Sequence, residues 1–158
     1  MADANSAFKD YVWDRRDDVL YRAQLSALYH RDRERWFDRL DRCSRLLAMV
    51  SGSAALLDVV PDACRPYLLA TVAISSALAV VFNFGEYARR HAELAAKWTL
   101  LEADIERAGE TNLDPAMVDN WTARRAEIES VEPPPCECVA RKAQRRLELA
   151  RRPAPHTR

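Results

Sequence analysis

PYLLATVAISSALAVVFNF, residues 66–84, is the stretch that decides the fold of this 158-residue chain. It carries no charged side chain over its nineteen residues, close to the roughly twenty that a helix needs to cross about 30 Å of hydrocarbon. Ser75 and Ser76 can bond to carbonyls of the preceding helical turn, so they cost little in an apolar environment. The stretch therefore predicts a membrane-spanning helix.

A second apolar stretch, LLAMVSGSAALLDVV at residues 46–60, precedes the first. Its one charge, Asp58, lies near its end, where interfacial water reaches a carboxylate at low cost. Pro61 and Pro66 mark a short turn, which makes the two helices antiparallel neighbours. In lipid, helices associate through small side chains. We expect the hairpin to pack through Ser51, Gly52, Ala55, Ala73, Ser76 and Ala77.

Arginine clusters at the outer ends of both apolar stretches, whereas the turn between them holds Arg65 alone. Because positive side chains stay on the cytoplasmic side, this asymmetry predicts that both termini are cytoplasmic. Nearly every cation is Arg, and the three lysines are the exception. This composition indicates a bacterial chain and hence a location in the inner (plasma) membrane. The side chains expected to contact anionic lipid headgroups are Arg39, Arg42, Arg45, Arg89 and Arg90.

Beyond residue 84 the apolar positions follow a spacing of four and three, which indicates a cytoplasmic coiled-coil seam on a helix that continues from the span without a break. Gly109 is placed to end this helix in a left-handed conformation. The seam residues are Tyr87, His91, Leu94, Trp98, Leu101 and Ile105. On the incoming helix the matching positions are Tyr29, Trp36, Leu40, Cys43 and Leu47.

The remaining segments also predict helices, so the fold class is all-α. We expect an amphipathic cytoplasmic helix over residues 1–28 and the two-span hairpin with its coiled coil over residues 29–132. Asp114 before Pro115 is typical of a helix start, and that helix should reach Ser130. Residues 133–158 then comprise a Pro-rich break, a basic helix over 139–152 and a disordered tail.

No arrangement of residues indicates catalysis, so we expect a protein that is not an enzyme and uses no cofactor or metal. His91 falls in the coiled-coil seam, and His30 beside the arginine block is expected at the interface. Cys136 and Cys138 lack the second ligand pair of a zinc knuckle, even with His156 nearby. Aspartates and glutamates interleave with the arginines and cancel most of the positive field, which argues against nucleic acid as a partner.

The hairpin and its flanks resemble SLATT domains, which are two-helix membrane domains found beside nucleotide-second-messenger synthases and SLOG-type sensors in bacterial conflict systems. The likeness covers residues 29–134, from RDRERWFDRLDR to FNFGEYARRHAELAAKWTLLEADIE and the Glu132-Pro133-Pro134 element. Cys136-Glu137-Cys138 departs from the family pattern, which leaves a tail-mediated partner contact unsupported. The resemblance implies an effector whose hairpins oligomerise and perforate the inner membrane after a cytoplasmic signal, with a nucleotide synthase or sensor as partner.

Three other functions fit the same residues. A non-toxic membrane scaffold would dock a soluble partner on its coiled-coil stalk, and a holin is likewise small with charged tails. A soluble helical bundle would instead bury both apolar stretches in its core.

Overall fold

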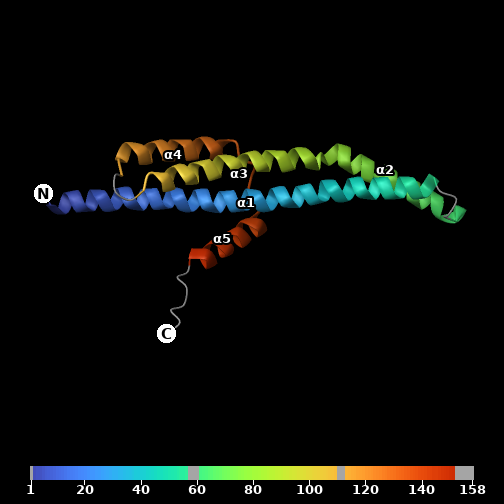
Figure 1. Ribbon diagram of the computed structural model, residues 1–158, viewed down its shortest axis with the longest axis horizontal. Helices are drawn as coiled ribbons and strands as arrows, with labels where there is room; N and C mark the ends of the chain where they lie inside the picture. Colours follow the sequence, from blue (N-terminus) through green and yellow to red (C-terminus); the bar gives the residue numbers. More distant parts are fainter. Residues whose placement is uncertain (1, 57–60, 110–112, 152–158) are drawn as a thin grey trace, which may run out of the picture. The chain divides into compact units, whose positions relative to one another are not determined.

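The computed structural model describes residues 2–56, 61–109 and 113–151, with side chains from residue 7 onward except at 54–56. These residues are helical, with no strand among them, as the sequence predicts. The elements are α1 (Ala2–Leu56), the 3-10 helix η1 (Asp62–Cys64), α2 (Arg65–Phe82), α3 (Phe84–Arg107), α4 (Pro115–Ser130) and α5 (Glu137–Arg151) (Figure 1). Asp58, His156 and the expected disordered tail fall outside the described residues.

The chain forms two compact units. Unit 1 comprises residues 1–32 and 92–158, and unit 2 comprises residues 33–91. The helix expected over residues 1–28 is the beginning of α1, which passes residue 28 without interruption.

Unit 1 is a helical bundle with an aliphatic and aromatic core. The first part of α1 contributes Val12, Val19, Ala23 and Ala27 at spacings close to one or two helical turns. The core is completed by side chains of α3 and α4: Leu94, Trp98, Leu101, Ile105, Val118, Trp121 and Ile128. Leu94, Trp98, Leu101 and Ile105 of the expected seam are buried, whereas Tyr87 is 49% exposed.

The boundaries of α3 and α4 follow from local chemistry. Gly109 has a φ of 66°, the left-handed conformation expected of a helix-ending glycine. Asp114 caps α4 by accepting a hydrogen bond from the backbone nitrogen of Ala116 at 3.1 Å, and Pro115 occupies the first helical position. α4 ends at Ser130, as predicted, and lies beside the adjoining part of α3 (Figure 1).

Ion pairs fasten α4 to the first part of α1. Arg15 donates to Asp119 at 2.8 Å, and Arg125 donates to Asp18 at 2.8 Å. Burial alone would lower the pKa of Arg125, but its hydrogen bonds to Glu129 and Asp18 outweigh the desolvation and raise that pKa.

α5 packs on α1 through two buried side chains, Ala143 and Leu147, and through Arg146. Arg146 Nη1 donates to both carboxylate oxygens of Asp32, at 2.9 and 2.8 Å. Replacing Arg146 by alanine should weaken the docking of α5 by about 1 kcal/mol, because the pair is only partly exposed. Amide hydrogen exchange within residues 137–151 should rise accordingly. Arg145→Ala, on the exposed side of α5, is the matched control, and an equal rise in both variants would contradict the role of Arg146.

Unit 2 is an antiparallel pair made by the second part of α1 and by α2, with the start of α3 (Figure 1). A Cβ built on Gly52 would lie 3.9 Å from Val72, and one built on Gly85 would lie 3.7 Å from Asp41. Residue numbers increase along one helix from contact to contact while they decrease along the other, so the two helices run antiparallel. Pro66 lies in the first turn of α2, as predicted.

The helix after the apolar stretch is not continuous, contrary to the prediction. Asn83 adopts a left-handed conformation, with φ 40° and ψ 53°, and separates α2 from α3. Its nitrogen donates to the Ala79 carbonyl at 3.1 Å, and its own carbonyl accepts from Glu86 at 2.9 Å. Asparagine tolerates this conformation better than other residues that have a Cβ, so one residue ends α2 and begins α3.

Candidate membrane hairpin

Two serines are the buried side chains of the described α1–α2 hairpin beyond residue 40. Ser51 of α1 and Ser75 of α2 are both buried, each 5% exposed. Ser75 Oγ donates to the Val72 carbonyl at 3.1 Å, so its hydroxyl is satisfied within its own helix. Ser44 Oγ of α1 likewise donates to the Asp41 carbonyl at 2.9 Å. Half-buried Val72 reaches this interface opposite Gly52, so the described part of the hairpin packs small and polar side chains together with Val72.

Large apolar side chains instead cover the outside of this hairpin. Val80 is 81% exposed and Ile74 is 61% exposed, although both are aliphatic. The exposed large side chains of the hairpin are Leu46, Leu47, Met49, Val50, Tyr67, Leu69, Ile74, Leu78, Val80, Val81 and Phe82. So many large apolar side chains exposed within one pair of helices are unusual on a protein that faces only water.

One helical segment among the described residues, Asp62–Arg107, is long and apolar enough to cross a membrane. Only 6% of its most apolar window is buried within the chain. The core helix of a soluble bundle would be mostly buried, so the low burial of this segment is the feature that the membrane interpretation would explain. Part of the first expected span, residues 57–60, lies outside the described residues.

The expected packing residues divide into two groups. Ser51 is buried, and Gly52 is half-buried with Val72 of α2 nearby. Ala73, Ser76 and Ala77 are exposed, and Ser75 takes the place expected for them. Because a helix turns about 100° per residue, Ala73 and Ala77 lie roughly opposite Ser75. The side chain of Ala55 is among those not described.

The five arginines expected to meet headgroups are all exposed. Arg42 pairs with Asp38 at 2.7 Å, and Arg45 pairs with Asp41 at 2.8 Å, one helical turn away in each case. Arg89 lies 4.0 Å from Glu86. Surface pairs of this kind contribute little to stability.

An aromatic cluster closes the end of unit 2 away from η1. Phe37 stacks on the ring of Tyr87 at 5.3 Å and on the ring of His91 at 5.6 Å. The Arg33 guanidinium lies 4.6 Å from the Phe37 ring centre. The incoming seam is therefore shifted by one residue from the prediction, since Phe37 is buried while Trp36 is half-exposed. Farther along it, Leu40 is half-buried, whereas Cys43 and Leu47 are exposed.

Unit 1 contains a buried polar anchor that no local pattern in the sequence indicates. His30, expected at an interface, is 1% exposed, and its Nε2 lies 2.8 Å from Glu132 Oε1. The indole nitrogen of Trp98 donates to the same carboxylate oxygen. Glu132 begins the Pro-rich segment between α4 and α5, so this anchor fixes that segment to the bundle. His30 and Trp98 lie 102 and 34 residues from Glu132 in the sequence, so no local sequence pattern indicates these contacts.

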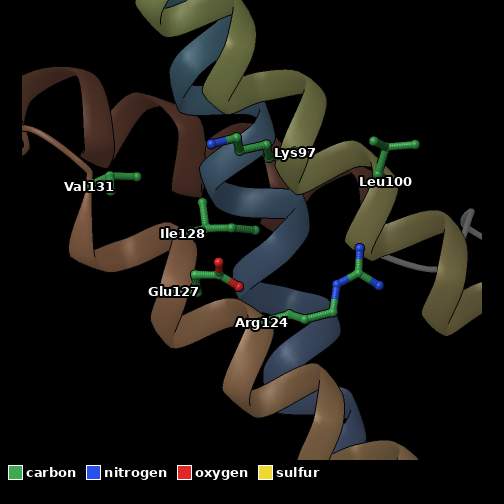
Figure 2. A pocket seen from close by; sticks show the side chains of 6 residues that line it. All are labelled: Lys97, Leu100, Arg124, Glu127, Ile128 and Val131. Atoms are coloured by element: carbon green, nitrogen blue, oxygen red, sulfur yellow. The ribbon is translucent and has the colours of Figure 1, made fainter.

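A shallow groove of about 240 Å³ lies between α3 and α4 in unit 1 (Figure 2). Lys97 and Arg124 reach it from the two helices, and Leu100 and Val131 supply exposed apolar surface. Arg124 donates to Asp104 at 2.5 Å, which leaves Lys97 as the more available cation. The groove is small and open, and it suits a side chain of a partner better than an enclosed ligand.

Comparison with family models, with curated proteins and with solved structures finds no match to this chain. Over residues 2–56, 61–109 and 113–151 the protein is of the all-helical class, and one segment within these ranges is able, by length and composition, to span a membrane.

Proposed function

We propose that the protein is an integral protein of the bacterial inner membrane whose α1–α2 hairpin lies in the bilayer. One observation carries this proposal: small and polar side chains such as Ser51 and Ser75 are inside the hairpin, while large aliphatic ones are outside. In water, exposed apolar surface has a free-energy cost of about 25 cal/mol per Å². In lipid, hydrocarbon chains solvate the same surface and this cost is absent. Arginine at the ends away from η1 favours cytoplasmic termini.

We further propose that the hairpins oligomerise and permeabilise the membrane, as an effector of a bacterial conflict system. The exposed stripe of Ala73 and Ala77 supports this step, because small residues allow a second hairpin to approach α2 from its open side. Ser76, also exposed, would bring a hydroxyl to that contact. The resemblance to SLATT domains supplies the biological context, including a nucleotide synthase or sensor as the activating partner.

Dye release from vesicles tests the permeabilising step. Full-length protein reconstituted into phosphatidylethanolamine–phosphatidylglycerol vesicles should release an entrapped dye, and the doubly substituted Ala73→Leu/Ala77→Leu protein should release it at least tenfold more slowly. Ala126→Leu, at an exposed position of α4, is the control and should release dye at the parent rate. Intact vesicles at every protein density, with the protein shown to be inserted, would refute permeabilisation.

A membrane-anchored scaffold is the second candidate, and the groove of Figure 2 favours it. Exposed Leu100 and Val131 beside Lys97 could receive an apolar and an acidic side chain of a soluble partner. The same vesicle experiment separates the two functions, since a scaffold inserts without releasing the dye.

A further inference from the structure

Cys136 and Cys138 form a close pair of thiols at the start of α5. Their sulfur atoms lie 3.1 Å apart, at hydrogen-bonding distance. Cys138 is exposed and Cys136 is half-buried, so small reagents reach the pair from solvent. Both residues belong to unit 1.

The two thiols are chemically different. The Cys136 carbonyl accepts from Val139 and Ala140, which places Cys136 at the N-cap of α5, where the helix dipole favours a thiolate. The hydrogen bond to Cys136 is the main cause that raises the pKa of Cys138. The position of Cys136 at the N-cap favours Cys136 as the nucleophile, which leaves Cys138 to attack second.

The geometry favours a disulfide over a metal. Two thiolates on one tetrahedral zinc ion, each about 2.3 Å from the metal, stand almost 4 Å apart, whereas a disulfide bond is about 2.05 Å long. From 3.1 Å, closure needs an approach of about 1 Å.

We propose that Cys136 and Cys138 are a redox-active dithiol that closes to a disulfide by exchange with a small-molecule disulfide. The Cys136 thiolate attacks one sulfur of the reagent, forms a mixed disulfide and releases one reagent thiolate. The Cys138 thiol then loses its proton and attacks Cys136 Sγ, which releases the second reagent thiolate. The two cysteines lose two protons and two electrons, and the reagent is reduced to two thiols.

Closure acts on the segment that holds α5. The Cys136 backbone nitrogen donates to Tyr29 Oη at 3.0 Å, and Glu132, four residues earlier, is bonded to His30 and Trp98. The small ring formed by the disulfide constrains Glu137, the first helical residue of α5, and strains the neighbouring Tyr29 bond. The oxidised protein therefore holds the start of α5 less tightly than the reduced protein. This inference is independent of the proposed function, since unit 1 carries it alone.

Peptide mapping tests the disulfide. Reduced full-length protein in detergent is incubated with glutathione disulfide, blocked with an alkylating reagent and digested with trypsin. The peptide of residues 126–141 contains both cysteines and should lose two hydrogens without gaining glutathione. Cys138→Ser should instead trap glutathione on Cys136, because the second attack is removed. Cys43→Ser/Cys64→Ser is the matched control and should oxidise like the parent. A reduced peptide, or a lasting adduct in the parent, overturns the proposal.

Hydrogen exchange tests the consequence for α5. Oxidation should raise exchange at residues 137–143 at least threefold in the parent and in Cys43→Ser/Cys64→Ser. It should leave Cys136→Ser/Cys138→Ser unchanged. Equal exchange in the oxidised and reduced parent overturns the coupling of the disulfide to α5.

Discussion

Replacing Ile74 by arginine is expected to remove the protein from the membrane fraction. Ile74 lies at the middle of α2, nine residues after Arg65 and eight before Phe82, and is 61% exposed. An arginine at the centre of a membrane helix costs about 3 kcal/mol on the insertion scale, more than a hundredfold in the insertion equilibrium. On a protein surrounded by water, the same change at an exposed site would stay within about 0.5 kcal/mol. The two environments therefore predict different results for one substitution.

Alkaline carbonate extraction of bacterial membranes provides the measurement. The parent should remain in the pellet, and Ile74→Arg should be extracted or degraded. Leu149→Arg is the matched control, because Leu149 of α5 is 63% exposed but belongs to unit 1. Ile74→Val, which keeps the apolar character, should behave like the parent. A parent extracted by carbonate, or Ile74→Arg retained as firmly as the parent, would refute insertion of α2.

The sequence predicted unit 1 better than unit 2, and the reason is physical. In unit 1 the buried positions Leu94, Trp98, Leu101 and Ile105 repeat at helical spacing, because water drives apolar side chains inward. Gly109 and Asp114 fixed helix ends through local chemistry that a single sequence contains. Helix ends that are determined by nearby residues can therefore be predicted from the sequence.

In the hairpin, apolar spacing no longer marks the inner face. Small residues occur on both sides of α2, so composition alone cannot distinguish Ser75 from Ala73 and Ala77 as the packed positions. For the same reason, Trp36 was predicted to be the packed aromatic residue on α1, whereas Phe37 is the buried one. The break at Asn83 was missed because asparagine within an apolar run does not by itself indicate a left-handed conformation.

Replacing Glu132 by alanine is expected to be among the most destabilising single changes in unit 1. Glu132 Oε1 is the acceptor for Trp98 and lies 2.8 Å from His30 Nε2, and both partner side chains are almost fully buried. A buried polar group left without its partner costs about 1–3 kcal/mol. With two such groups affected, the free energy of unfolding of unit 1 should fall by about 2–5 kcal/mol. Glu127→Ala, at an exposed position of α4, should change it by less than about 0.5 kcal/mol.

A double-mutant cycle isolates the shared hydrogen bond from the loss of packing. Trp98→Phe keeps an aromatic ring in the core but removes the indole donor, so Glu132→Ala should cost less in that background, by about 1 kcal/mol or more. The measurement is the free energy of opening from amide exchange in residues 94–105 and 128–131, which flank the anchor in α3 and at the end of α4. Additive costs would mean that Glu132 does not act through Trp98. Because His30 remains in both backgrounds, the cycle assigns the coupling to the indole nitrogen rather than to the imidazole.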